Sequence, residues 1–154
     1  MMENEWKMNT LSTKKLLIFK SKIKQPFELT VEGTSMLPIL HPGQRIKVCA
    51  KDDYSIGDIL LFFYKNDILL VHRLLKIENG RYFCKGDNSF RLEDVEKSAI
   101  LGAVIQIKDV NNTPEFISAS YTINRVFRCC GYDIEKTRLT PEYTAYWQNY
   151  LISE

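Results

Sequence analysis

Short runs of β-branched and aromatic residues follow one another through the middle of the chain. Turn-forming clusters such as His41-Pro42-Gly43 and Glu78-Asn79-Gly80 separate them. Runs of this length bounded by such clusters are typical of antiparallel strands joined by hairpins. The pattern predicts strands at Phe27–Val31, Arg45–Cys49, Ile59–Tyr64, Ile68–Ile77, Tyr82–Lys85 and Leu101–Ile107.

The runs at 59–64 and 68–77, which flank Lys65-Asn66-Asp67, predict the most regular hairpin. The fold class expected is therefore mainly β, as an antiparallel β domain with a C-terminal helical segment. We divide the chain into a basic N-terminal segment (1–26), the β domain (27–110) and an aromatic-rich helical appendage of that same domain (111–154).

Both flanking segments have helical features. Residues 7–24 contain lysines without acids, which fits either a basic amphipathic helix or a short helix that leads into a strand near Phe27. We interpret these lysines first as a solvated face, with binding to a membrane surface or a partner as the alternative. In the last segment, Pro141 opens a helical pattern that contains aromatic side chains, which we expect to dock on the β domain: Tyr143, Tyr146, Trp147 and Tyr150.

Composition excludes several classes of function. The 154 residues carry a net charge of only +2, which gives no indication of nucleic-acid binding. The most apolar stretch, 59–71, is interrupted by polar residues and is too short to span a bilayer, and the N-terminus does not resemble a signal peptide. The cysteines and histidines lack the spacing of metal ligands, so we expect no metal, no cofactor, free thiols and a cytoplasmic location.

A candidate nucleophile lies in the segment Gly33-Thr34-Ser35-Met36-Leu37-Pro38. A serine held in a glycine-containing turn after a strand can be presented to a substrate, and its own backbone N–H can help to form an oxyanion hole. A serine in such a position is also a common hydrogen-bonding turn residue. The local sequence leaves both interpretations open.

A serine hydroxyl needs a base within hydrogen-bond reach to act as a nucleophile near neutral pH. The chain has two histidines. His41 lies in the loop just after Ser35 and is most simply an exposed turn residue. His72 lies on a predicted strand, where it is either the general base or a structural histidine. The later cluster Lys85-Gly86-Asp87-Asn88 offers a carboxylate that could orient it, or forms a simple turn.

These pieces, taken in order, resemble the serine peptidase clan of type I signal peptidases and LexA-type self-cleaving repressors. The matching segments are Gly33 to Pro38, Gly57-Asp58-Ile59, Val71-His72-Arg73, Lys85 to Asn88, and Leu101-Gly102. Bacterial members use a lysine base. The histidine at this position is similar to the archaeal and endoplasmic-reticulum type, whose site is Ser, His and Asp.

The resemblance implies a signal-peptidase-like or LexA-like fold and a serine endopeptidase with Ser35 as nucleophile and His72 as base. It implies Asp87 as the carboxylate, with Asp94 as the alternative, because Glu93 and Asp94 fall near the place of the catalytic Asp in eukaryotic members. The oxyanion and substrate-binding positions correspond to Thr34 and Met36. Members of this type carry a membrane anchor ahead of the nucleophile, whereas residues 1–34 are basic.

The implied substrate is a leader or signal-like peptide or a precursor protein, with association to a membrane surface or an exporter as a further expectation. The sequence does not indicate an oligomeric state. Two other functions remain open. One is a non-catalytic peptide-binding module on the same fold. The other is a LexA-type self-cleaving regulator, although no Ala-Gly or Cys-Gly bond of the kind that such proteins cut precedes Ser35, and the one Cys-Gly bond, Cys130-Gly131, lies far downstream.

Overall fold

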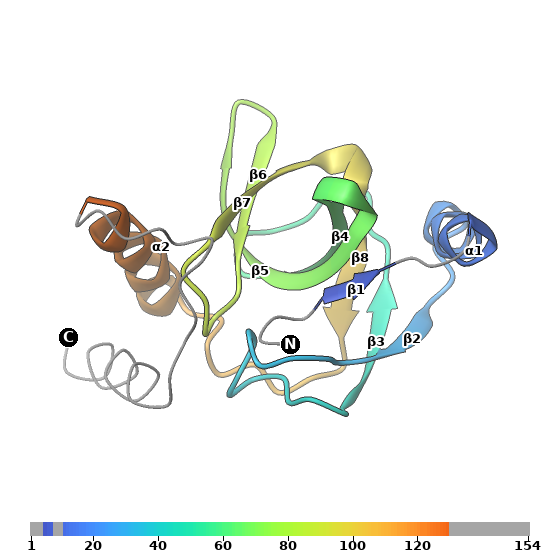
Figure 1. Ribbon diagram of the computed structural model, residues 1–154, viewed down its shortest axis with the longest axis horizontal. Coiled ribbons are helices and arrows are strands. Elements are labelled where there is room, and N and C mark those ends of the chain that lie inside the picture. The colour runs from blue at the N-terminus through green and yellow to red at the C-terminus, as the bar shows by residue number, and fades with distance from the viewer. Residues whose placement is uncertain (1–4, 8–10, 130–154) are drawn as a thin grey trace.

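The chain folds into one curled antiparallel sheet with a helix on either side (Figure 1). This computed structural model describes residues 5–7 and 11–129. The strands are paired in the order β2-β3-β8-β4-β5-β6-β7, and β1 pairs with β5 outside this path. Their bounds are β1 Glu5–Lys7, β2 Phe27–Thr30, β3 Arg45–Cys49, β4 Ile59–Tyr64, β5 Ile68–Glu78, β6 Arg81–Lys85, β7 Leu92–Glu96 and β8 Ile100–Ile105.

The mainly antiparallel β fold with a C-terminal helix is confirmed. The hairpin of β4 and β5 is also confirmed, with Tyr64 opposite Ile68 across the turn. The predicted strand 27–31 ends one residue early, because the backbone of Val31 pairs instead with Gln44 and Gly43. The last strand ends at Ile105, since Gln106 has a positive φ of 60° that leaves the extended region.

Two strands were not predicted. β7 has the sequence Leu-Glu-Asp-Val-Glu, which looks like an acidic loop. Its alternation is nevertheless that of a strand with one buried face, because Glu93 and Val95 are buried while Asp94 and Glu96 are exposed. β1 is a three-residue strand in the N-terminal segment and is held by its pairing with β5.

The helices are α1 (Leu11–Lys22) and α2 (Pro114–Cys129). The N-terminal segment therefore contains a helix that leads through a turn into the strand at Phe27, one of the two patterns expected. Its apolar residues do not gather on one face, because Leu17 is buried whereas Leu16 and Phe19 are exposed. The segment is not an amphipathic helix of the expected kind.

The curled sheet has an apolar cluster on each face. Leu69 and Val71 of β5 belong to the cluster that also contains Leu17 of α1, and Leu70 and Leu74 belong to the other. This alternation places His72 on the face of Leu70 and Leu74. Both faces of β5 are therefore covered by apolar side chains, and His72 is buried on one of them.

No helix in the described part of the chain is long and apolar enough to cross a membrane. The helical pattern predicted after Pro141, with its aromatic side chains, and the Cys130-Gly131 bond lie outside the described residues. Two cysteines within the described part, Cys49 and Cys84, are free thiols.

Candidate active site

Ser35 lies in a tight turn that follows β2. The turn begins at Gly33, whose φ of 75° is accessible to glycine at little cost, and it is held by the Leu37 N–H, which donates to the Thr34 carbonyl at 3.2 Å. The N–H groups of Ile39 and Leu40 both donate to the Met36 carbonyl at 2.9 Å. The backbone around Ser35 is thus fixed by local hydrogen bonds.

The structure brings Ser35 and His72 into contact. The distance between Ser35 Oγ and His72 Nε2 is 3.0 Å, which is within hydrogen-bond range. The residues are 37 positions apart in the chain and come from a turn and from the middle of β5. The His72 ring also meets the edge of Phe62 on β4, which limits its rotation.

The carboxylate that contacts His72 belongs to Glu93 of β7. Glu93 Oε1 lies 2.6 Å from His72 Nδ1, and both side chains are fully buried. Its other oxygen accepts a hydrogen bond from Arg91 Nε at 3.0 Å. Because an ionised carboxylate only accepts hydrogen bonds, Nδ1 carries the proton in the neutral ring, and Nε2 is left to accept from the Ser35 hydroxyl.

The two carboxylates predicted from the sequence lie elsewhere. Asp87 makes a bidentate ion pair with Arg73, whose Nε and Nη2 lie 2.8 and 2.9 Å from its two oxygens. Asp94 points to solvent and pairs with Arg81 at 2.7 Å. Neither is the partner of His72 Nδ1 among the hydrogen bonds of the described residues.

The alternation of β7 is the signal that could have found Glu93. In Leu92-Glu93-Asp94-Val95-Glu96, the residue that shares a face with the apolar Val95 is Glu93 and not Asp94. Treating the segment as a strand would therefore have selected Glu93. In the strand register, Glu93 lies opposite Cys84 of β6, and Cys84 lies opposite Leu74 of β5, two residues after His72.

The turn after β6 is hydrogen-bonded to the turn that contains Ser35. The Asn88 N–H donates to the Ser35 carbonyl at 2.8 Å, and its side-chain amide donates to the Thr34 carbonyl at 3.2 Å. Gly86 passes so close that an added Cβ would lie 2.7 Å from the Ser35 carbonyl oxygen and 3.1 Å from His72 Nε2. The Gly86-Asp87-Asn88 turn thus fixes the backbone of Ser35, and we call this turn the clamp. Asp87 stabilises the clamp through its ion pair with Arg73.

The two residues predicted for the oxyanion hole and substrate binding, Thr34 and Met36, lie in different environments. Thr34 is half-buried, and its carbonyl accepts from Asn88. Met36 is fully buried in the apolar core, and its Sδ accepts a hydrogen bond from the Asp87 N–H at 3.4 Å. Met36 therefore packs the two turns together, and its side chain does not line a surface.

A buried lysine lies next to this clamp. Lys85 Nζ donates to Ser120 Oγ of α2 at 2.9 Å and to the Gly86 carbonyl at 3.3 Å. Loss of solvation on burial lowers the pKa of Lys85 to about 8, against the opposing effect of the carboxylates of Asp87 and Glu93. Lys85 thereby connects the site to α2.

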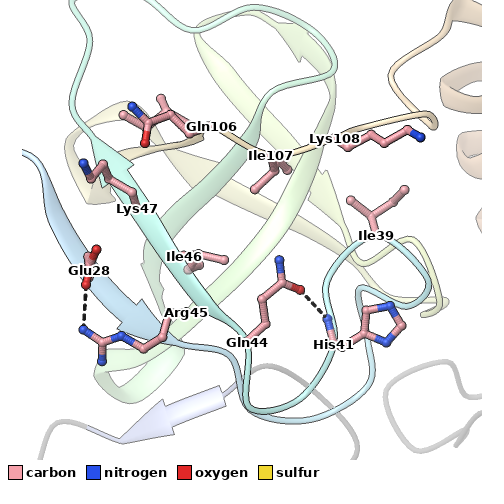
Figure 2. Close-up of a pocket in the computed structure, with 11 residues that line it drawn as sticks. Glu28, Ile39, His41, Gln44, Arg45, Ile46, Lys47, Gln106, Ile107 and Lys108 are labelled. Atoms are coloured by element: carbon pink, nitrogen blue, oxygen red, sulfur yellow. Dashed lines mark hydrogen bonds and ion pairs between the residues drawn. The ribbon is translucent and has the colours of Figure 1, made fainter.

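A pocket of about 600 Å³ lies beside the loop that follows Ser35 (Figure 2). Its walls come from β2, β3, this loop and the segment after β8, and they include His41 and Arg45 but not Ser35, His72 or Glu93. His41 is exposed, as expected, and its backbone N–H donates to the Gln44 side chain at 3.0 Å. This pocket is distinct from the contact between Ser35 and His72.

The three side chains form a chain of hydrogen bonds from a hydroxyl through an imidazole to a carboxylate. Such an arrangement can activate a serine for attack on a carbonyl group. Within the described residues, no group of three or more His, Cys, Asp or Glu side chains is placed to hold a metal ion. Neither a protein-family model nor a solved structure was found to match the chain.

Proposed function

We propose that the protein is a serine endopeptidase similar to the signal peptidases that use a Ser/His site, and that it cleaves a leader or signal-like peptide or a precursor protein. The observation that carries the proposal is the continuous hydrogen-bonded series from Ser35 through His72 to Glu93. Glu93 takes the role that the sequence resemblance would give to Asp87 or Asp94.

The geometry supports a definite sequence of proton transfers. Ser35 Oγ attacks the carbonyl carbon of the scissile peptide bond while its proton passes to His72 Nε2. Glu93 stabilises the resulting imidazolium through Nδ1. The proton then passes to the leaving amine, and a water molecule, deprotonated by the same nitrogen, hydrolyses the acyl ester and restores Ser35.

The burial of the site favours catalysis over simple peptide binding. Ser35 is 1% exposed, and His72 and Glu93 are fully buried. Burying a carboxylate and an imidazole is unfavourable unless each is hydrogen-bonded, and replacing such a group with apolar side chains often stabilises a protein. A binding module requires none of these three groups, whereas a serine hydrolase requires a nucleophile and a base that meet.

The test is incubation of the purified full chain with a pool of unstructured peptides, followed by mass spectrometry. Ser35→Ala and His72→Ala variants are run beside it, with His41→Ala as the matched control for a histidine outside the series. We expect cuts that disappear in the first two variants and persist in the control. Cuts that survive in Ser35→Ala, or a parent that binds peptides and leaves them intact, would argue for a binding module.

A further inference from the structure

The two edges of β5 are used differently along its length. One edge pairs with β4 from Ile68 to Arg73. The other edge pairs with β6 only from Arg73 to Glu78, and with β1 from Ile68 to Leu70. His72 lies between these two partners, at the place where the neighbour of β5 changes.

β1 is therefore positioned beside the site along the strand that carries the base. Its register with β5 is antiparallel, with Lys7 opposite Ile68, Trp6 opposite Leu69 and Glu5 opposite Leu70. Figure 1 shows β1 as a short strand near β5, with which it pairs in the curled sheet. Leu70 precedes His72 by two residues, so the β1 backbone ends about 7 Å along the strand from the level of the base.

An extended peptide commonly binds a protein by adding a strand to an open sheet edge, where main-chain hydrogen bonds supply affinity. The stretch of β5 just before His72 is the edge from which a bound peptide would pass directly to Ser35. In this structure that edge is taken by the protein's own β1.

We propose that β1 is an intramolecular competitor that occupies the peptide-binding edge of β5 and keeps a peptide substrate off that edge until the substrate displaces it. This inference rests on the proposed function for its consequence on catalysis. The pairing covers only three residues, and tethering gives such a segment an effective concentration in the millimolar range. A free peptide that pairs with a longer stretch of the same edge can therefore compete with β1.

The test disrupts β1 without altering the site. Neighbouring residues of a strand point their N–H groups to opposite sides, so the double variant Glu5→Pro with Trp6→Pro removes the N–H that faces β5 whichever of the two supplies it. The matched control, Glu5→Ala with Trp6→Ala, removes the same side chains and keeps both N–H groups. Both are made in the full chain.

The first readout is the initial rate of cleavage of a peptide that the parent cuts. We expect the proline variant to cleave it at least about tenfold faster at low substrate concentration, through a lower KM, and the alanine control to stay near the parent. Equal rates in the proline and alanine variants would overturn the inference.

The second readout does not depend on cleavage. Each double variant is combined with Ser35→Ala, and binding of a fluorescent peptide with the sequence of residues 1–10 is followed by anisotropy. We expect binding to the proline variant that is at least about tenfold tighter than binding to the alanine control, because only the latter retains its tethered competitor. Equal or absent binding in both would again overturn the inference.

Failure of the proposed function gives a different result. A small phosphonofluoridate that needs no strand pairing is applied to the alanine control, and modification of Ser35 is read by mass spectrometry. Absence of a Ser35 adduct together with tighter peptide binding to the proline variant would reject the peptidase and retain the competing strand. A Ser35 adduct together with equal peptide binding by the proline and alanine variants would retain the peptidase and reject the competing strand.

Discussion

At the scale of single residues, the account depends on Glu93. Its Oε1 is the partner of His72 Nδ1, and Arg91 holds its second oxygen. A carboxylate in this position keeps the imidazole in the tautomer that can accept the serine proton, and it stabilises the imidazolium that follows. Glu93 acts through His72 and is therefore a positioning residue.

We predict that Glu93→Gln lowers kcat by about 10²- to 10⁴-fold, because an amide can donate to Nδ1 and so stabilise the wrong tautomer. The control is Glu96→Gln on the same strand, whose side chain is exposed and paired with Arg81. Peptide cleavage rates measured across pH would check this. A Glu93→Gln enzyme with the parent rate and pH profile would show that Glu93 does not orient the base.

At the scale of elements, α2 is connected to the site through Lys85 of β6, which donates to Ser120. A second contact comes from Asn124 of α2, whose side-chain amide donates to the Phe90 carbonyl. Both contacts are buried, so the helix and the turn that clamps Ser35 are expected to respond to the charge on Lys85.

This leads to a prediction for stability against pH. The pKa of Lys85 is about 8 in the folded protein and 10.5 in its ordinary state, so between these values the unfolded chain binds more protons. Stability attributable to Lys85 must then rise with pH, by roughly 3 kcal/mol in total. The check is to measure the free energy of unfolding of the parent and of Lys85→Met by denaturant at about pH 7 and about pH 10. If the difference in unfolding free energy between the two proteins is the same at both pH values, the prediction is contradicted.

The elements differ in how far the sequence predicted them. Runs such as 45–49 and 59–64 coincide with strands because β-branched and aromatic residues bounded by turns leave few alternatives. β7 was missed because three acidic residues among five are typical of a loop. One of the three, Glu93, is explained only by the structure, in which it is buried against His72. β1 is held by long-range pairing that local propensity does not encode.

The same reasoning applies to the site. The pairing of Ser35 with His72 was predicted from a motif order, and the structure places the two side chains in contact. The carboxylate could not be chosen from spacing, because Asp87, Glu93 and Asp94 lie within one short stretch. Cross-strand register and the competing charge of Arg73 decide which of them meets His72.

At the scale of the whole molecule, Arg73 joins segments that are distant in the chain. It is fully buried and forms ion pairs with Asp87 and Asp109, and it donates to the Gly57 carbonyl at 2.9 Å. Burial is the largest single effect on the pKa of Arg73 and acts to lower it. The pKa is nevertheless held above its ordinary value, because the hydrogen bonds that Arg73 donates to Asp87 and Asp109, together with their negative charges, outweigh the cost of burial.

We predict that Arg73→Met destabilises the fold by about 3–5 kcal/mol, because it leaves the buried carboxylate of Asp87 and the partly buried carboxylate of Asp109 without their arginine partner. Arg81→Met is the matched control on the neighbouring strand, where the pairs with Asp94 and Glu96 are exposed, and it should change stability by no more than about 1 kcal/mol. Chemical denaturation of the variants measures both. Similar small effects for the two arginines would refute the joining role of Arg73.

The central claim is that Ser35 is a nucleophile activated by His72, and covalent labelling tests it most directly. The full-length parent and His72→Ala are treated with a small phosphonofluoridate, and the modified residue and its rate of formation are read by peptide mass mapping. The account predicts a single adduct on Ser35 in the parent and a loss of at least about 10²-fold in rate without His72. An adduct on another serine, no adduct, or an equal rate in His72→Ala would contradict it.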